Sequence, residues 1–234
     1  MSDAATSNDG VFLITGASSG IGAATARRAA QEGWRVVLAA RSAERLRELA
    51  QELGGGERAL AVPCDVTDWE QQRQMVDAAV EAFGRVDVAF ANAGFGGKRG
   101  FSEDTPEHWR EMVLTNVLGA ALTIRATRQQ LIANRGRLLL TSSVAGRRVL
   151  PGSLYSCTKH AVTAMGEAAR QELHDKGVRV TVIEPGMVDT PFFDERPRDA
   201  LQDDDVARAV MYAVAQPDHV SINEVLLRPT AQAG

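Results

Sequence analysis

A tyrosine and a lysine four residues apart are the side chains best suited to acid–base chemistry in this chain. Tyr155 and Lys159 lie at the start of a long helical pattern. Side chains four positions apart share one face of a helix, so the phenol and the ammonium are expected at one site. A phenol ordinarily titrates near pH ~10, and a neighbouring cation favours its ionised form. The spacing therefore predicts a tyrosine acid–base group whose pKa is shifted toward neutrality.

Two adjacent serines precede this tyrosine in the sequence. An apolar run ends in Leu140-Thr141-Ser142-Ser143, which is the pattern of a buried strand followed by hydroxyl groups. Ligands of open α/β sheets bind at the carboxyl ends of the strands. The two serines are therefore expected at the ligand-binding edge of the sheet.

A glycine-rich turn follows the first apolar run and precedes a helical pattern. Glycine permits the tight turn, lets the backbone approach a pyrophosphate, and lets the helix pack close to the strand. Unpaired N–H groups at the helix N-terminus attract the anion. The spacing is G-x-x-x-G-x-G, and its place between strand and helix predicts a dinucleotide site. The expected contacts are Gly16, Ser18, Ser19, Gly20, Ile21 and Gly22.

The end of the second predicted strand indicates which dinucleotide binds. An acidic residue there would hold the ribose 2′-hydroxyl of NAD, whereas an arginine accommodates the 2′-phosphate of NADP. Arg41 follows Ala39-Ala40, with Ser42 beside it. A guanidinium pairs with phosphate oxygens through two parallel hydrogen bonds. NADP(H) is therefore the preferred cofactor, and NAD(H) is the alternative.

Short apolar runs alternate with helix-length segments along the whole chain. This alternation predicts a parallel sheet, because parallel neighbours need a long crossover that helices supply. We expect a doubly wound α/β fold of three layers, a Rossmann fold, with a mostly or wholly parallel seven-stranded sheet. Residues 10–234 are expected to form a single domain after a flexible tail, residues 1–9. The predicted strands are Val11–Thr15, Arg35–Ala40, Ala59–Val62, Val86–Phe90, Gly136–Thr141, Val178–Ile183 and Ile222–Leu227.

The predicted helices lie near residues 20–32, 42–53, 68–83, 106–133, 155–176 and 203–215. Two of them carry start signals. Thr67 and Glu70 have the spacing of a capping box, and Thr105-Pro106 places a hydroxyl cap before a proline at the first helical position.

Composition excludes several other classes of protein. The chain has 234 residues, a formal net charge of −4 and no block of basic residues, so nucleic acid is not an expected partner. No apolar run approaches the about 20 residues that span a bilayer. The two cysteines are too few for a disulfide framework, and the four histidines lack metal-ligand spacing. We therefore expect a cytoplasmic chain without a metal site.

These motifs together resemble the short-chain dehydrogenase/reductase family over essentially the whole chain. The resemblance rests on five ordered motifs, which are Thr15–Gly22, Asn92-Ala93-Gly94, the serine-containing strand end, Tyr155-x-x-x-Lys159 and Pro185-Gly186. It implies an oxidoreductase that transfers a hydride between nicotinamide and an alcohol or carbonyl compound. It also implies a homotetramer or homodimer.

The resemblance further implies a role for each matching residue. Tyr155 would be the general acid or base, and Lys159 would lower its pKa and bind the nicotinamide ribose. Asn116 would support a water chain that leads to the lysine. Cofactor contacts are implied for Asp65 and Val66 at the adenine, for Asn92, Ala93 and Gly94 at the adenosine ribose, and for Pro185, Gly186, Val188 and Thr190 at the nicotinamide.

Two departures from the family pattern affect the site. The turn common in the family, Asn-Asn-Ala-Gly, begins with Ala91 here. The context Ser-Val-Ala-Gly selects Ser143 as the serine that would hydrogen-bond the reacting oxygen, whereas the family's usual separation from the tyrosine selects Ser142. Ser143 is favoured, with a connection through Arg147–Ser153 that is one residue shorter.

Two other interpretations of function stay open. One is a regulatory or scaffold protein that senses NADP(H) without turnover, and the other is an NAD-linked dehydrogenase of the same family. The segment Pro191–Leu201 is short, which predicts an open pocket with a small lid. The ending Ile222–Thr230 is similar to that of family members acting on hydroxy acids and small aldehydes.

Overall fold

The computed structural model describes residues 9–191 and 198–232. Seven strands form one sheet in the order β3-β2-β1-β4-β5-β6-β9, and every neighbouring pair is parallel. The predicted Rossmann fold with a seven-stranded parallel sheet is confirmed. The strands are β1 (Val11–Thr15), β2 (Arg35–Ala40), β3 (Ala59–Pro63), β4 (Val88–Ala91), β5 (Arg137–Thr141), β6 (Arg179–Pro185) and β9 (Glu224–Leu227).

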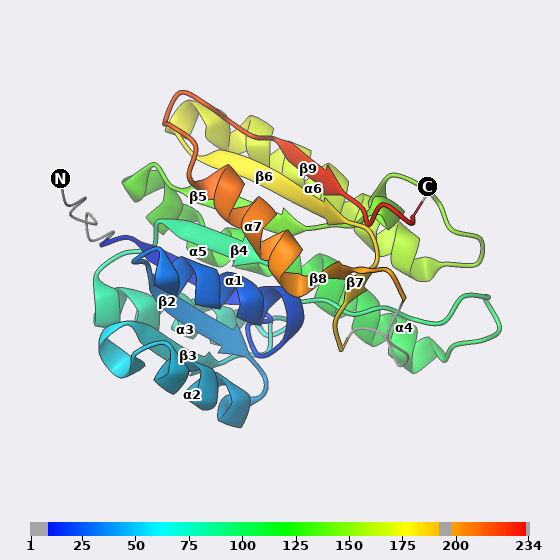
Figure 1. Ribbon diagram of the computed structural model, residues 1–234, viewed down its shortest axis with the longest axis horizontal. Helices are drawn as coiled ribbons and strands as arrows, with labels where there is room; N and C mark the ends of the chain where they lie inside the picture. The colour runs from blue at the N-terminus through cyan, green and yellow to red at the C-terminus, as the bar shows by residue number, and fades with distance from the viewer. Residues whose placement is uncertain (1–8, 192–197, 233–234) are drawn as a thin grey trace.

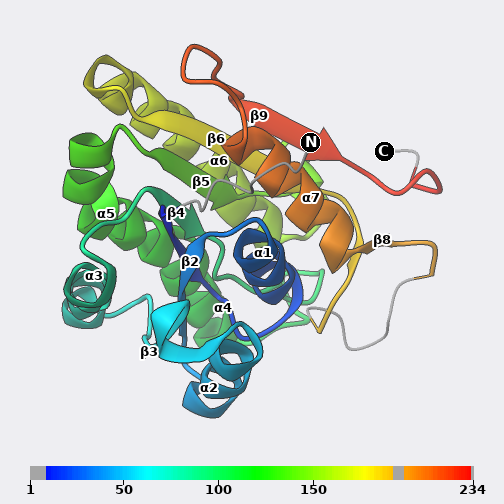
Figure 2. The ribbon, with the colours of Figure 1, turned by 60° about the vertical axis from the view of Figure 1, so that its left-hand side comes forward.

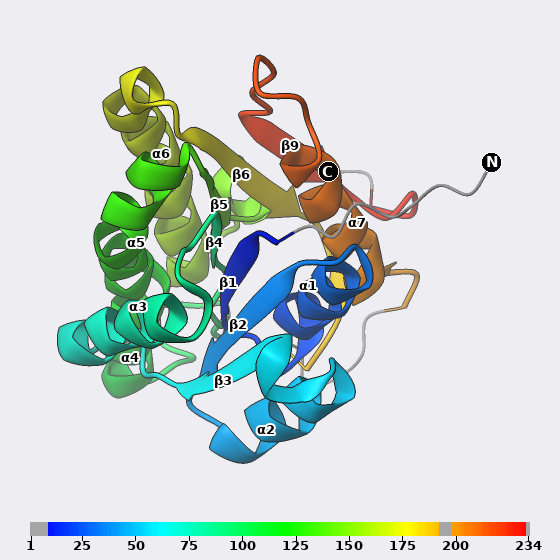
Figure 3. The same cartoon turned by 90° about the vertical axis from the view of Figure 1, so that its left-hand side faces the viewer.

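Helices cover both faces of the sheet. Figure 3 shows α3, α4, α5 and α6 on one side of it and α1, α2 and α7 on the other. The helices are α1 (Gly20–Gln31), α2 (Ala43–Glu52), α3 (Trp69–Phe83), α4 (Pro106–Val113), α5 (Ala120–Asn134), α6 (Leu154–Leu173) and α7 (Asp203–Val214). Such two-sided cover explains why the strands are nearly continuous apolar runs.

Strand β1 shows how the two cores arise from one sequence. Successive side chains of a strand point to opposite faces. Phe12 and Ile14 therefore pack into the core beneath α1, α2 and α7, whereas Val11 and Leu13 pack into the core beneath α3, α5 and α6. All four side chains are fully buried.

The carboxyl ends of the strands gather on one side of the molecule. In Figure 1 the arrows of β6 and β9 point toward the side where α4 and the short strands β7 (Val188–Asp189) and β8 (Leu201–Gln202) lie. Figure 2 shows the same gathering from a second direction. The parallel pair of β7 and β8 was not predicted, because two residues are too short for a hydropathy pattern.

The helix expected over residues 106–133 is interrupted. A π-helical segment, Leu114–Gly119, separates α4 from α5. Gly119 packs so closely on Val66 that an added Cβ would lie 2.7 Å from the valine Cγ2 atom. The buried amide of Gln72 donates hydrogen bonds to the carbonyls of Val66 and Gly119 at 2.9 and 3.0 Å. These long-range contacts favour the wider turn, which the helical periodicity does not encode.

One predicted helix cap is wrong and one is confirmed. Asp68, not Thr67, caps α3, because its carboxylate accepts from the Glu70 and Gln71 amides. The Thr67 hydroxyl instead donates to Asp65 at 2.8 Å. Thr105 caps α4 by accepting from the His108 amide.

The expected N-terminal tail and the expected lid lie largely outside the described residues. The tail expected at residues 1–9 lies outside the described residues except for Asp9, and the lid expected within Pro191–Leu201 lies outside them from 192 to 197.

Candidate active site

The glycine-rich turn joins β1 to α1 with little space to spare. Gly16 and Gly20 have φ angles of +66° and +51°, which favour glycine. An added Cβ at Gly22 would lie 2.3 Å from the carbonyl oxygen of Gly16. The N-cap residue of α1 is Ser19, whose side chain makes no capping hydrogen bond. The first-turn amides of α1 therefore lack a side-chain oxygen cap, which suits an anion.

Asn92 connects the ends of three strands beside this turn. Its amide nitrogen donates to the carbonyl of Thr15 at 3.1 Å, and its carbonyl oxygen accepts from the Thr141 hydroxyl at 3.0 Å. The backbone amides of Asn92 and Ala93 both donate to the Thr15 hydroxyl, at 3.0 and 3.2 Å. Thr15 was not singled out from the sequence, although a hydroxyl at the end of an apolar strand was a signal for it.

Tyr155 and Lys159 meet at the start of α6, as their spacing predicts. Ser153 caps this helix through a hydrogen bond from the Ser156 amide at 3.1 Å. The Lys159 ammonium lies over the Tyr155 ring, 5.6 Å from its centroid, and donates to the carbonyl of Thr141 at 2.7 Å. The lysine is almost wholly buried, so its amine is fixed between α6 and the end of β5.

The pKa of the tyrosine differs from the expectation. Burial raises the pKa of Tyr155 to about 12, while a hydrogen bond with Ser143 acts in the opposite direction. Burial lowers the pKa of Lys159 to about 8. The expected lowering of the tyrosine pKa by the ammonium is therefore wrong for this structure. The cation faces the ring, and exclusion of water disfavours the charged form of both groups.

The adjacent serines face different partners. Ser143 bonds the Tyr155 phenol, and its hydroxyl also donates to the carbonyl of Pro185 at 3.3 Å. Ser142 donates to the carbonyl of Lys159 at 3.0 Å and shares a 2.7 Å hydrogen bond with the Thr163 hydroxyl. Ser143 therefore lies with the phenol, and Ser142 lies against the backbone of α6.

Asn116 lies in the π-helical segment next to the lysine. Its amide nitrogen donates to the Phe95 carbonyl at 2.9 Å and to the Thr158 hydroxyl at 3.1 Å, and its oxygen accepts from the Phe95 amide at 3.0 Å. An added Cβ at Gly94 would lie 3.0 Å from the Asn116 oxygen and 3.6 Å from the lysine nitrogen. Gly94, Asn116 and Lys159 are therefore close neighbours.

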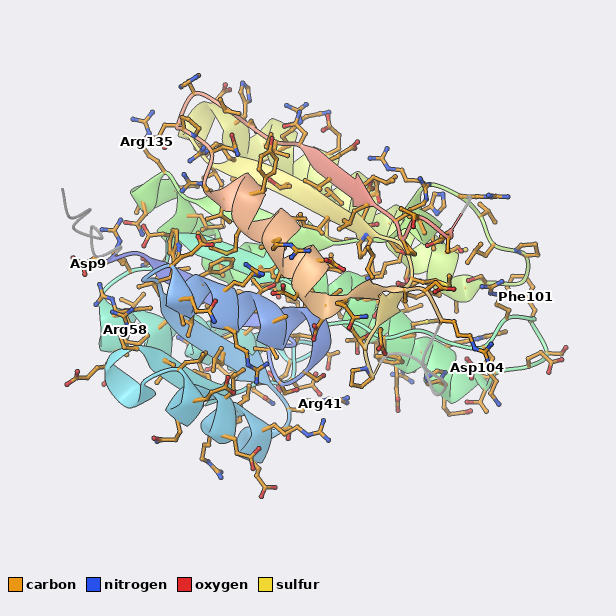
Figure 4. The ribbon with its side chains drawn as sticks, viewed as in Figure 1. Asp9, Arg41, Arg58, Phe101, Asp104 and Arg135 are labelled. Atoms are coloured by element: carbon orange, nitrogen blue, oxygen red, sulfur yellow. The ribbon has the colours of Figure 1, made fainter. Side chains whose placement is uncertain are left out.

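A cavity of about 350 Å³ lies at the ends of β2 and β3. Arg41 and Asp65 both line it, and Figure 4 shows Arg41 at the end of β2. Ser42 is the N-cap residue of α2, and buried Val66 packs on Gly119. The other lining residues were not expected at the site from the sequence, which are Thr67, Phe95, His108, Glu111, Leu114 and Thr115.

A second cavity of about 380 Å³ lies at the start of α1. Ser18, Ser19 and Gly20 line it, together with Arg27 and Arg45. Glu48 and Glu52 also line this cavity, so basic and acidic side chains are mixed in it, as they are in the first cavity.

The segment after β6 returns toward the glycine-rich turn. The amide of Gly186 donates to the carbonyl of Leu227 at 2.8 Å. Val188 is buried among the side chains beneath α1 and α7. An added Cβ at Gly20 would lie 3.1 Å from the Thr190 methyl group, so this segment lies against the turn. The structure brings the predicted site residues to one edge of the sheet.

The described part of the chain has neither a candidate metal site nor a candidate membrane span. Within residues 9–191 and 198–232, no group of three or more histidine, cysteine or acidic side chains is arranged to hold a metal ion. None of the helices in those ranges is long and apolar enough to cross a bilayer.

Comparison with known proteins gives a consistent family. A family model described as short chain dehydrogenase matches residues 10–201. An uncharacterized oxidoreductase of Staphylococcus saprophyticus is 38% identical over 228 residues, which cover 94% of this chain and 97% of the relative.

Solved structures agree with this match. An alcohol dehydrogenase from Thermococcus sibiricus, complexed with 5-hydroxy-NADP, superposes with a TM-score of 0.88 at 34% identity, over 96% of this chain and 98% of that one. A 3-ketoacyl-(acyl-carrier-protein) reductase from Brucella melitensis, complexed with NADH, has a TM-score of 0.88 at 29% identity, over 94% and 97%. This chain belongs to the short-chain dehydrogenase family of oxidoreductases.

Proposed function

We propose that the protein transfers a hydride between NADP(H) and an alcohol or carbonyl substrate, with Tyr155 as the general acid or base. The observation that carries this proposal is the arrangement around the phenol. Tyr155 is hydrogen-bonded to Ser143, and the Lys159 ammonium lies over its ring. A proton donor, a second hydroxyl and a cation at one sheet edge suit a substrate oxygen that gains negative charge.

The residues at the sheet edge fit a nicotinamide dinucleotide. The Gly16–Gly22 turn leaves first-turn amides for a pyrophosphate, with Ser18, Ser19 and Ile21 beside them. The cavity at Arg41 and Asp65 suits adenine and the 2′-phosphate, which favours NADP(H). The segment from Pro185 to Thr190 would hold the nicotinamide. When bound, the cofactor supplies the hydride chemistry.

The cofactor preference is a proposal that rests on Arg41. One solved relative is complexed with an NADP analogue and another with NADH, so the family accommodates both. Arg41 is exposed at the rim of its cavity, where a guanidinium can pair with phosphate oxygens.

The protein's own groups then handle the proton. At neutral pH a phenol with a pKa of about 12 is protonated, so Tyr155 donates to the oxygen of a carbonyl substrate during reduction. Ser143 donates a second hydrogen bond to that oxygen. Lys159, held by the Thr141 carbonyl, and Asn116, beside it, support the return of the proton from solvent.

The decisive experiment replaces Tyr155 with phenylalanine. Tyr155→Phe is expected to lower turnover by about a thousandfold, because the proton donor is lost. The dissociation constant for NADPH is expected to stay within about twofold, since the ring remains in place. The matched control is Tyr212→Phe, which alters the chain's only other tyrosine, an exposed residue on α7.

Turnover is followed by NADPH absorbance against a panel of aldehydes, ketones and the corresponding alcohols and hydroxy acids. Retention of most activity by Tyr155→Phe contradicts the proposal. NADPH binding with no turnover of any compound by the wild type favours the sensor interpretation instead.

The substrate class and the oligomeric state are two further proposals. The similarity of the C-terminal strand to members acting on hydroxy acids and small aldehydes makes these compounds the first part of the panel. We also propose a cytoplasmic homotetramer or homodimer, which light scattering after gel filtration tests.

A further inference from the structure

An ion pair between a buried carboxylate and a partly exposed arginine side chain lies directly behind the Ser143 turn. Glu184 is fully buried on β6, and the Nε atom of Arg147 donates to its two carboxylate oxygens at 2.7 and 2.9 Å. Arg147 also pairs with Glu224 on β9. The Thr163 hydroxyl on α6 donates to Glu184 at 3.2 Å. One carboxylate thus connects a loop, a strand and a helix.

The pair closes the short turn that carries Ser143. This turn is a single 3₁₀ segment, Val144–Gly146, with Ser143 before it and Arg147 after it. The Ser143 hydroxyl donates to the carbonyl of Pro185, and the Arg147 guanidinium donates to Glu184. Both ends of the turn are therefore fastened to two consecutive residues of β6.

The same network holds α6 against this turn. The Thr163 hydroxyl lies within hydrogen-bond distance of both Glu184 and the Ser142 hydroxyl, and the Ser142 hydroxyl also lies 3.0 Å from the carbonyl oxygen of Lys159. The two hydroxyl protons form two of these three hydrogen bonds at a time. An added Cβ at Gly146 would lie 2.4 Å from the Ser142 hydroxyl and 2.8 Å from the Lys159 carbonyl oxygen. The turn and the helix that carries Tyr155 are thus in direct contact, without room for a methyl group.

Stability alone is a weak reason to keep such a pair. Removing the Glu184 carboxylate from water is costly, and apolar side chains of similar volume often replace buried charged ones with no loss of stability. A charged, multiply hydrogen-bonded carboxylate does define geometry more narrowly than apolar packing. Glu184 lies between the turn that carries Ser143 and the helix that carries Tyr155, so a fixed carboxylate can set the relative position of these two side chains.

We propose that Arg147 and Glu184 are positioning residues that set the placement of Ser143 relative to Tyr155. This inference rests on the proposed function, because it concerns the two hydroxyl groups that would bind the reacting oxygen. Neither residue touches that oxygen; both act through the Ser143 turn and α6.

The test compares two arginines that each neutralise a buried carboxylate. Arg147→Met is expected to lower kcat by about tenfold to a hundredfold, since small displacements of reacting groups cost this much. The KM and the dissociation constant for NADPH are expected to stay within about threefold, because the glycine-rich turn is untouched. Arg147→Lys is expected to recover most of kcat, because an ammonium still bonds Glu184.

The matched control is Arg85→Met. Arg85 pairs with buried Asp87 at the opposite, amino end of the sheet, at 2.6 Å. This variant is expected to lose stability without loss of kcat. Melting temperatures are measured for all variants, and kinetics are recorded well below each of them.

Two results would overturn the positioning role. Arg147→Met with wild-type kcat is one, and an equal fall of kcat in Arg85→Met is the other. Full activity of Tyr155→Phe contradicts the proposed function itself, whereas full activity of Arg147→Met beside an inactive Tyr155→Phe contradicts only the positioning role.

Discussion

At the scale of single residues, the site combines a neutral phenol with an amine whose charge burial disfavours. Burial raises the pKa of Tyr155 to about 12 and lowers that of Lys159 to about 8. Near neutral pH the phenol is therefore protonated, as the proposed reduction of a carbonyl requires. The lysine keeps its charge at pH 7 against a desolvation cost, so the stability of the fold and the proposed role of this lysine oppose one another.

Comparison of the wild type with Lys159→Met at different pH values measures the desolvation cost of Lys159. The folded-state pKa of about 8 lies below the ordinary 10.5, so the unfolded chain holds more protons between these values. Stability rises with pH wherever the unfolded state binds more protons. From pH 7 to pH 10 the free energy of unfolding of the wild type should therefore gain about 2 kcal/mol relative to Lys159→Met.

Urea unfolding of both proteins without cofactor measures this difference. The lost hydrogen bond to Thr141 affects the comparison equally at both pH values. A difference that does not change with pH would show that Lys159 is not desolvated as the structure indicates.

The two serines give a second test at this scale. Ser143→Ala is expected to lower kcat by about a hundredfold, because a donor to the reacting oxygen is lost. Ser142→Ala removes bonds to α6 only, so a loss of about 1 kcal/mol in stability is expected, with a much smaller change in kcat. Steady-state kinetics of the two variants side by side decide between them, and the reverse order of kcat would assign the role to Ser142.

The sequence alone left the choice between these serines open. Their spacing from Tyr155 favoured Ser142, and the motif Ser-Val-Ala-Gly favoured Ser143. In extended backbone, neighbouring side chains point in opposite directions, so only one of them faces the phenol. That direction depends on the length of the loop up to Ser153, and spacing does not show how a shortened loop is accommodated. The catalytic role of Ser143 stays a prediction.

At the scale of elements, the conformation of the glycine-rich turn depends on the close approach of Gly16, Gly22 and Asn92. Intrinsic helix propensity predicts that Gly22→Ala, inside α1, stabilises the protein by about 0.5–1 kcal/mol. The structure predicts the opposite sign. An added methyl would lie 2.3 Å from the Gly16 oxygen and 2.8 Å from the Asn92 amide nitrogen.

Gly22→Ala is therefore expected to cost about 1–3 kcal/mol through overpacking and to weaken dinucleotide binding. Gly56→Ala is the control, because an added Cβ there meets nothing within 4 Å. Thermal unfolding and NADPH titration of both variants measure the effect. A gain in stability for Gly22→Ala, with binding retained, would show that the turn is looser than the structure indicates.

Element boundaries were predictable where a local signal sets them. The bounds of β1 and β2 agree with the apolar runs, and the Thr105 cap agrees with the start of α4. The π-helical segment that contains Asn116 was missed, because it depends on contacts of Gly119 with Val66 and Gln72. The cap of α3 was misplaced by one residue, because Asp65 engages the Thr67 hydroxyl.

At the scale of the whole molecule, the sheet assembles one ligand site from distant parts of the chain. The ends of β1, β2, β4, β5 and β6 contribute to it, so no single segment contains the site. The parallel direction of the strands follows from the alternation of strands and helices, and for this reason the fold class was predictable from the sequence. The order of the strands in the sheet was not predicted, because it depends on long-range packing. That residues 10–234 form a single domain stays a prediction. A ligand across these strand ends should stabilise the entire fold, since it binds only the folded state.

Thermal shift with the two oxidised cofactors tests this linkage and the role of Arg41 together. At a concentration of 100 times its dissociation constant, NADP⁺ adds about 2.7 kcal/mol to the free energy of unfolding. For a chain of this size that corresponds to a rise in Tm of about 5–10 °C.

Arg41→Ala is expected to weaken NADP⁺ binding by about tenfold to a hundredfold, because charge-assisted hydrogen bonds to the 2′-phosphate are lost. The NAD⁺ shift should stay unchanged, because NAD⁺ lacks that phosphate. Arg47→Ala controls for the change in net charge, because Arg47 is an exposed arginine on α2, the helix that follows Arg41. A wild-type shift that is larger with NAD⁺ than with NADP⁺ at equal concentration would reverse the proposed preference, and Arg41 would then be an exposed residue between β2 and α2 without a role in cofactor binding.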